Sequence, residues 1–265
     1  MKSKECLRFY NRYGPFAVVA GGSNGLGEAF ASALARRGLN LVLIAREKDR
    51  LEAASERLKI KYSIDVITFT ADLNNYENVR DFLSGRNIPI GLLVYNAAFA
   101  PIGLFENTSE EHLSQAAGVN VRTPLLLSKY LSASMIKNKR GGIVLMSSLA
   151  GMQGSFMLAA YAATKSFNTV LAQGLWKEFR SHGVDVIACC AGAISTPGYQ
   201  QAKSKKEAPG TMSAAAVAEK TLNAIGKKPF VIPGMINKIA YIVLSRLLTK
   251  KTAIAIMSKN TADLS

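Results

Sequence analysis

The stretch AVVAGGSNGLGEAF, residues 17–30, decides the fold. Its first four residues are small or β-branched and apolar, as in a strand that is buried on both faces. Gly21, Gly25 and Gly27 follow, and a helical pattern begins among them. Glycines at such a strand–turn–helix junction let the backbone turn tightly and approach a pyrophosphate, whose charge the helix N-terminus stabilises. The spacing is GxxxGxG and not the common GxGxxG, so a plain tight turn is the alternative.

The same alternation of strand and helix continues along the chain. Further short apolar runs lie at residues 39–45, 65–71, 91–97, 141–148, 184–191 and 229–233, with amphipathic stretches between them. Continuous apolar runs indicate strands covered on both faces, and repeated strand–helix units indicate a parallel sheet. We therefore expect an α/β fold over residues 1–265: one Rossmann-like domain, with a doubly wound parallel sheet of about seven strands flanked by helices.

Two segments interrupt this rhythm. Residues 198–213 are polar, basic and closed by Pro-Gly, so a mobile basic loop is expected there. Residues 235–258 form a C-terminal amphipathic segment, and its first part, 235–248, is expected to be one helix. One stripe of this helix carries Ile236, Ile239, Val243 and Leu247. The stripe either covers a lipophilic substrate or rests on a membrane surface; core packing and a subunit interface are the alternatives.

Positive charge is concentrated near the C-terminus. The formal net charge is +15, and residues 199–260 hold eleven Lys and Arg against two acids. No nucleic-acid motif and no interleaving of arginines with aromatic residues accompanies this charge, so we expect no nucleic-acid partner. A localised basic patch suits an anionic lipid surface, a phosphorylated cofactor or an acyl-CoA-like substrate. The alternative is a solvated basic face.

Composition and cysteine usage favour a cytoplasmic protein. No apolar run reaches the roughly 18 to 20 residues that span a bilayer, and the basic N-terminus lacks the apolar core of a secretory signal. The cysteines have neither disulfide-framework nor metal-ligand spacing, so we expect buried small side chains and no metal site. His112 and His182 have no partner for catalysis and are expected at the surface.

The end of the second expected strand bears on the choice of cofactor. An acid at this place bonds the free ribose hydroxyls of NAD. The chain reads LIAR here and ends the strand with Arg46. A cation in place of the acid favours the 2′-phosphate, and hence NADP(H) over NAD(H). An ordinary surface arginine is the alternative reading of Arg46.

Residues 14–197 resemble the short-chain dehydrogenase/reductase family. AGGSNGLG (20–27) resembles its cofactor loop, ADL (71–73) its adenine-contacting element, YNAA (95–98) the turn after strand four, and AGAIST (191–196) its nicotinamide loop. Three residues differ from the family pattern: Ala20 replaces the usual Thr, Ala98 the usual Gly and Ala191 the usual Pro. These positions shape the loops, so the differences affect loop geometry and not the catalytic residues. The resemblance implies a set of cofactor-binding residues: Gly21, Ser23, Asn24, Gly25, Leu26, Gly27, Arg46, Asp72, Leu73, Asn96, Ala97, Tyr161, Lys165, Gly192, Ile194 and Thr196.

The resemblance also implies a catalytic set, Asn120, Ser148, Tyr161 and Lys165, with Ser148 at the family spacing of thirteen residues before Tyr161. A tyrosine hydroxyl has a pKa of about 10, too high for ready proton exchange at neutral pH. A lysine one helical turn away is expected to lower that pKa by its charge. Tyr161 would then donate a proton to a carbonyl oxygen that Ser148 holds. Asn120 would order a water next to Lys165, and Lys165 would also hold the nicotinamide ribose.

The spacing Tyr-xxx-Lys occurs a second time, as YQQAK at residues 199–203. No strand-end serine precedes Tyr199, and the expected loop offers no fixed helical face that would present Lys203 to it. The neighbours of the motif, and not the motif alone, therefore identify Tyr161 as the proton donor.

Within the family, the opening YGPFAVVAGG and the tail PFVIPGMINKIAYIVLSRLL look most like the branch of 17-beta-hydroxysteroid dehydrogenases and 3-oxoacyl-CoA reductases. This resemblance implies an NADPH-dependent oxidoreductase that reduces the ketone of a lipophilic substrate, such as a 3-oxoacyl thioester or a ketosteroid. The alternatives are an NAD(P)-dependent alcohol dehydrogenase working in the oxidative direction and a catalytically silent NADP-binding regulator. A homodimer or homotetramer is also expected, as is peripheral contact with a membrane.

Overall fold

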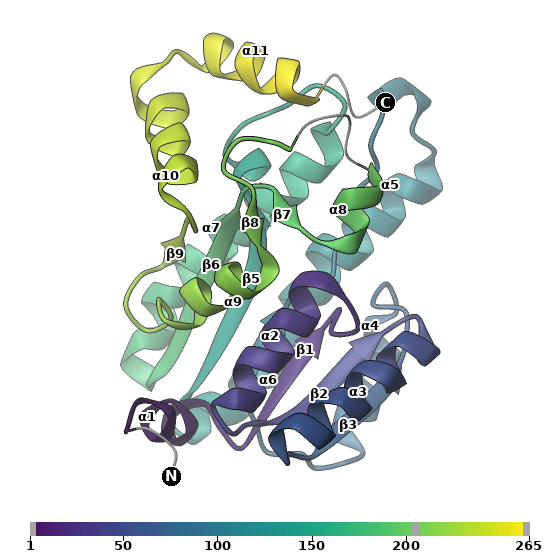
Figure 1. Cartoon of the computed structure of the whole chain (residues 1–265), viewed down its shortest axis with the longest axis vertical. Coiled ribbons are helices and arrows are strands. Elements are labelled where there is room, and N and C mark those ends of the chain that lie inside the picture. Colours follow the sequence, from purple (N-terminus) through teal and green to yellow (C-terminus); the bar gives the residue numbers. More distant parts are fainter. Residues whose placement is uncertain (1–3, 203–206, 262–265) are drawn as a thin grey trace.

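The apolar runs of the sequence form one parallel sheet (Figure 1). The computed structural model describes residues 4–202 and 207–261. Seven strands lie in the order β3-β2-β1-β4-β5-β6-β9, and every pair is parallel. Their bounds are Phe16–Ala20 (β1), Asn40–Ala45 (β2), Val66–Thr70 (β3), Ile90–Tyr95 (β4), Gly141–Ser148 (β5), Val184–Ala191 (β6) and Phe230–Val231 (β9). The α/β prediction of a doubly wound parallel sheet is confirmed.

Alternate residues of the central strand enter two separate apolar layers. Ala17 and Val19 pack in one layer, and Val18 and Ala20 pack in the other, as the period of two in a strand requires. Burying one such valine stabilises the fold by about 1.5–3 kcal/mol. Helices α2 (Gly25–Arg36), α3 (Lys48–Tyr62) and α9 (Ala214–Leu222) cover the first layer, and α4 (Tyr76–Ser84), α6 (Thr123–Lys137) and α7 (Ala159–Phe179) cover the second.

The order of the strands places a switch point beside β1. Strand β1 pairs with β2 on one side and with β4 on the other, and its last residue, Ala20, lies opposite both Ile44 and Tyr95. The connection after β1 therefore leads to β2 on one side, whereas the connection after β4 leads to β5 on the other side. In open α/β sheets, ligands bind at the carboxyl ends of the strands at such a point.

The segment after β6 is more ordered than an irregular loop, so that prediction for residues 198–213 is wrong in part. Strands β7 (Ile194–Ser195) and β8 (Met212–Ser213) pair with each other, and helix α8 (Pro197–Ala202) lies between them. Thr196 Oγ1 accepts from the backbone nitrogen of Tyr199 (3.2 Å), and this bond fastens the first turn of α8. Tyr199 is therefore helical, contrary to expectation, while Lys203 lies outside the described residues.

The C-terminal segment also differs from the single helix expected over 235–248. Helix α10 (Met235–Ile242) passes into a π-helical turn (Val243–Leu247), and α11 (Lys250–Thr261) follows after a break. Ile236, Ile239 and Leu247 are exposed, so packing of the stripe into the chain's own core is excluded. Within the described part of the chain, no helix combines the length and the apolar character that crossing a bilayer requires.

Candidate active site

The glycine loop between β1 and α2 leaves no room for side chains. Gly21 has a φ of +80°, and a Cβ there would lie 2.9 Å from the backbone of Ala97. A Cβ on Gly27 would overlap the carbonyl oxygen of Gly21. Asn96 Nδ2 donates to this same oxygen (3.1 Å), and Asn24 Oδ1 accepts from the Gly25 nitrogen (2.7 Å) at the start of α2. The loop thus keeps its backbone open to a phosphate at the helix N-terminus, as a dinucleotide requires.

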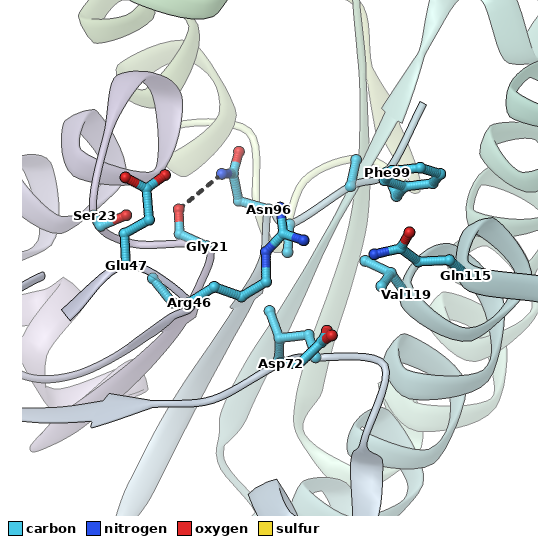
Figure 2. A pocket seen from close by; sticks show the side chains of 13 residues that line it. Gly21, Ser23, Arg46, Glu47, Asp72, Asn96, Phe99, Gln115 and Val119 are labelled. Atoms are coloured by element: carbon cyan, nitrogen blue, oxygen red, sulfur yellow. Dashed lines mark hydrogen bonds between the residues drawn. The ribbon is translucent and has the colours of Figure 1, made fainter. Parts of the chain in front are cut away.

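A cavity of about 360 Å³ opens beside this loop at the switch point (Figure 2). Seven predicted cofactor residues line it, namely Gly21, Ser23, Arg46, Asp72, Leu73, Asn96 and Ala97. The cavity thus brings together the ends of β1, β2 and β4 with the loop after β3. Of the other predicted residues of the glycine loop, Leu26 and Gly27 are buried, and they shape the loop instead of lining the cavity.

Six further residues line this cavity and were not among the predicted cofactor-binding residues: Ala45, Glu47, Ala98, Phe99, Gln115 and Val119. Figure 2 shows the side chains of Phe99, Gln115 and Val119 across the cavity from the glycine loop. They come from the segment after β4, from α5 (Glu110–Ala117) and from the π-helical turn Gly118–Arg122. No motif marks these residues, because only the fold brings the turn next to β4.

Charge in the cavity is carried mainly by Arg46, Glu47 and Asp72 (Figure 2). Arg46 is exposed, and among the described residues no acid forms an ion pair with it. Glu47 pairs with Arg50 (3.1 Å) at the start of α3, and Asp72 Oδ1 accepts from the Asn74 nitrogen (2.9 Å). Arg46 is therefore an available cation at the place where a 2′-phosphate is expected, with an acid as its neighbour in the chain.

Asn120 lies in the π-helical turn and is fully buried. Its Oδ1 accepts from the Phe99 nitrogen (2.8 Å), and its Nδ2 donates to the Phe99 oxygen (2.7 Å) and to Thr164 Oγ1 (3.0 Å). Its carbonyl oxygen accepts from Asn168 Nδ2 (3.0 Å). Asn120 therefore joins the segment after β4 to α7. The expected water next to Lys165 stays a prediction.

Lys165 enters the site on α7 and is buried. Its Nζ donates to the carbonyl oxygen of Met146 (3.0 Å), and Ser147 Oγ donates to the backbone oxygen of Lys165 (2.7 Å). Both bonds tie α7 to β5, one and two residues before Ser148. Burial lowers the pKa of Lys165 to about 8. Ser147 was not foreseen as a positioning residue, although it stands next to the predicted Ser148.

Tyr161 lies in the first turn of α7, within hydrogen-bonding reach of Ser148. Burial raises the pKa of Tyr161, and a side-chain hydrogen bond with Ser148 opposes the increase. The expectation that Lys165 lowers this pKa is wrong for the protein alone, because desolvation outweighs other effects. The Lys165 Nζ lies 5.6 Å from the centre of the Tyr161 ring and is bonded to Met146. Tyr161 is consequently protonated at neutral pH.

The predicted nicotinamide loop, with Gly192, Ile194 and Thr196, faces the glycine loop. A Cβ on Gly25 would lie 3.1 Å from Thr196 Cγ2, although 171 positions separate these residues in the sequence. A Cβ on Gly192 would lie 2.7 Å from Asn237 Oδ1 of α10. The two loops and α10 therefore meet at the carboxyl end of the sheet.

A second cavity, of about 480 Å³, adjoins the first at Phe99. Its lining combines apolar side chains, Phe99, Pro101, Ile102, Leu104 and Met157, with the polar side chains of Asn107, Thr108 and His112. Met157 stands four residues before Tyr161 at the start of α7. The cavity therefore offers a space with an apolar part near the expected proton donor.

The histidines and cysteines lie outside the proposed chemistry. His112 and His182 are exposed, as predicted, and the His112 ring packs against Phe99 at a centroid distance of 5.4 Å. Cys189 and Cys190 are buried in β6, also as predicted. Within residues 4–202 and 207–261, no group of three or more His, Cys, Asp or Glu is placed to hold a metal ion.

Comparison with known proteins places the chain among dehydrogenases. The sequence profile of the short chain dehydrogenase family matches residues 15–207. Hydroxysteroid dehydrogenase-like protein 1 of Gallus gallus is 32% identical, over 70% of this chain and 57% of the relative. Very-long-chain 3-oxoacyl-CoA reductase of Mus musculus is 31% identical, over 70% of this chain and 61% of the relative. Inactive hydroxysteroid dehydrogenase-like protein 1 of Mus musculus is 32% identical, over 66% and 54%.

These three matches cover a little more than half the length of each relative. Among solved structures, a 7beta-hydroxysteroid dehydrogenase shares the fold with a TM-score of 0.88 at 23% identity, over 94% of this chain and 98% of that chain. A short-chain dehydrogenase from Sphingobium yanoikuyae, solved with NADPH, gives a TM-score of 0.75 at 28% identity, over 83% and 87%.

Proposed function

The chain belongs to the short-chain dehydrogenase/reductase family, and on that premise we propose that it is an oxidoreductase acting between a carbonyl and an alcohol with a nicotinamide cofactor. The observation that carries this proposal is the meeting of three predicted catalytic residues. Ser148 ends β5, and Tyr161 and Lys165 lie on the helix that Ser147 fastens to β5. Beside them, the glycine loop fits a dinucleotide. The bound cofactor would supply the hydride.

The side chains of the chain itself would manage the proton. The Ser148 oxygen accepts from the Ala150 nitrogen (3.2 Å). Its hydroxyl hydrogen, which is directed to Tyr161 in the protein alone, would turn to the oxygen of a bound substrate. Tyr161, which is protonated at neutral pH, would donate its hydroxyl proton to that oxygen. Lys165 would hold the cofactor ribose with its remaining donors.

The first prediction concerns Tyr161. Changing Tyr161→Phe removes only the hydroxyl, and we expect turnover to fall by about two to four orders of magnitude, the usual contribution of general acid catalysis. The measurement is NADPH consumption across a panel of ketones and 3-oxoacyl thioesters. Tyr199→Phe is the matched control. The Tyr199 hydroxyl accepts from the Ala208 nitrogen (3.0 Å), so its loss is expected to change substrate affinity at most. Equal losses in both variants would refute the assignment.

We also propose that NADP(H) is preferred over NAD(H), on the strength of the exposed and unpaired Arg46 in the cavity. The relative from Sphingobium yanoikuyae, solved with NADPH, is in agreement. Glu47 acts against this preference, but its pairing with Arg50 offsets part of its charge.

The second prediction tests this preference. Arg46→Ala is expected to weaken NADPH binding about 10- to 100-fold, the effect of one charge-assisted contact, while NADH binding stays unchanged. Titration of both cofactors by fluorescence would measure the ratio of affinities. The control is Arg57→Ala. It removes an exposed arginine of α3 that is paired with Glu28 of α2. A ratio that does not move in Arg46→Ala contradicts the role of this residue.

For the substrate we propose a lipophilic ketone, such as a 3-oxoacyl thioester or a ketosteroid. Apolar side chains in the lining of the second cavity, Ile102, Leu104 and Met157 among them, support this class. So do the names of two relatives, a very-long-chain 3-oxoacyl-CoA reductase and a hydroxysteroid dehydrogenase-like protein. A cytoplasmic location and a homodimer or homotetramer remain predictions from the sequence.

A catalytically silent NADP-binding regulator is the second candidate, because one similar relative is named inactive. The same substrate panel separates the two. Tight binding of NADPH with no consumption across the panel would favour the regulator, whereas turnover that depends on Tyr161 favours the oxidoreductase.

A further inference from the structure

Helix α10 presents an apolar face that no other segment of residues 4–202 and 207–261 covers. Its exposed large side chains, with their exposed fractions, are Met235 (70%), Ile236 (58%), Ile239 (54%) and Ile242 (47%), and Leu247 (71%) follows in the π-helical turn. The four residues of the helix share one face, since positions three and four apart are neighbours on a helix. A contiguous apolar patch of this kind marks an interaction site in soluble and membrane-surface proteins.

The surroundings of this face are strongly basic. Between positions 220 and 261 the sequence holds eight Lys and Arg and no acid. Five of these cations lie on α10, α11 and the turn between them: Lys238, Arg246, Lys250, Lys251 and Lys259. All five are exposed, and none of them is in an ion pair with an acid of the described residues. All charged residues described on α10, on α11 and on the turn between them are thus basic.

We propose that this face of α10 docks on an anionic lipid surface. Apolar side chains beside lysines and arginines are the combination that inserts into the acyl boundary while the cations meet anionic headgroups. A second copy of the same face would bring two groups of unpaired cations together, so like charges disfavour a symmetric dimer through it. Figure 1 shows α10 and α11, in yellow, at the end of the molecule opposite α1, where a flat surface can reach them.

The opposite side of α10 is fixed to the candidate active site. Asn237 is buried, and its Nδ2 donates to the oxygens of Pro233 (2.9 Å) and Gly210 (3.0 Å). Its side chain also lies against Gly192 of the predicted nicotinamide loop. Docking would therefore hold the predicted nicotinamide loop near the lipid surface, where an apolar ketone is concentrated. Only this last consequence rests on the proposed function; the docking itself does not.

The test is co-sedimentation of the full chain with lipid vesicles. We expect binding to vesicles of phosphatidylglycerol and phosphatidylcholine in equal parts, and at least about tenfold weaker binding to phosphatidylcholine alone. Added salt is expected to weaken the binding. Ile239→Glu is expected to reduce binding to the anionic vesicles by about tenfold or more. Ile60→Glu is the matched control, because it makes the same substitution at another exposed isoleucine, on α3 (81% exposed, against 54% for Ile239).

Three results would overturn the proposal. The first is an absence of binding to anionic vesicles by the unaltered chain. The second is an equal loss in Ile239→Glu and Ile60→Glu, which would show that charge alone attracts the chain. The third is a dimer in analytical ultracentrifugation that only Ile239→Glu dissociates, which would assign the face to a second copy. None of these measurements depends on turnover, so failure of the proposed oxidoreductase activity remains distinguishable.

Discussion

At the scale of single residues, Lys165 occupies a position that favours function over stability. It is 2% exposed, and burial lowers its pKa from 10.5 to about 8. Between these two pH values the unfolded chain binds more protons than the folded chain, so the contribution of Lys165 to stability rises with pH across this window. Below pH 8 the folded protein carries the full cost of a buried cation.

Replacing Lys165→Met is therefore expected to stabilise the fold while removing turnover. The shift in pKa corresponds to about 3 kcal/mol, and the loss of the bond to the Met146 oxygen returns about 1–2 kcal/mol. We expect a net gain of about 1–2 kcal/mol in the free energy of unfolding at pH 7, shrinking as the pH rises from 8 toward 10.5. Urea denaturation at several pH values would measure it.

Lys177→Met is the control for this prediction, since Lys177 is exposed on the same helix. A gain in Lys177→Met equal to that in Lys165→Met would show that burial of the cation is not the cause. A gain in Lys165→Met that does not change with pH would contradict the lowered pKa.

Residue types at the site were readable from the sequence, but their electrostatics were not. The spacing of Ser148 and Tyr161 and the helical turn between Tyr161 and Lys165 are local properties, and the structure places all three on β5 and α7. Whether the pKa of Tyr161 is raised or lowered depends on how deeply the folded chain buries the side chain, and the sequence does not contain that information. The same reason hid Phe99 and Asn168, whose contacts with Asn120 exist only in the folded chain.

At the scale of secondary structure, two glycines in helices have opposite roles. Gly27 in the first turn of α2 cannot accept a Cβ, because the Gly21 carbonyl occupies that place. Gly174 in the interior of α7 has nothing within 4 Å of its Cβ position. Gly27→Ala is expected to abolish cofactor binding, and Gly174→Ala to raise the free energy of unfolding by about 0.5–1 kcal/mol.

Thermal unfolding with and without NADPH would measure both effects. NADPH is expected to raise the melting temperature of Gly174→Ala as it does for the unaltered chain, but not that of Gly27→Ala. Stabilisation of Gly27→Ala by NADPH would show that the loop tolerates a side chain and that the close approach is not needed.

Long strands were predicted almost to the residue, whereas short elements were not. GGIVLMSS and VDVIACCA form β5 and β6 with the expected bounds. The pattern of a strand buried on both faces is written in consecutive residues, so it can be read directly. Helix α8 depends on a bond in which Thr196 Oγ1 accepts from the Tyr199 nitrogen. Helix α10 ends at Ile242, and the backbone nitrogen of Val243 caps it by donating to the carbonyl oxygens of its last turn. Such tertiary and terminal contacts leave no periodic signal.

At the scale of the whole molecule, the sheet and its switch point followed from the repeated strand–helix units, because right-handed crossovers leave few arrangements. The position of the C-terminal segment did not follow. Its amphipathic pattern is equally typical of a helix on a core, on a partner or on a lipid, and only the fold shows the face of α10 uncovered. Asn237, which fixes that helix to Gly192 and Gly210, is an unremarkable residue in the sequence.

The order of the strands also bears on synthesis by the ribosome. When β1, β2 and β3 have emerged they can pair, but the other edge of β1 stays open until β4 emerges about 25 residues later. At about 5–20 residues per second, this takes about 1–5 s. An open parallel edge is prone to wrong pairing. During this time the nascent chain is open to wrong pairing on the side of β1 that later bears the cofactor cavity.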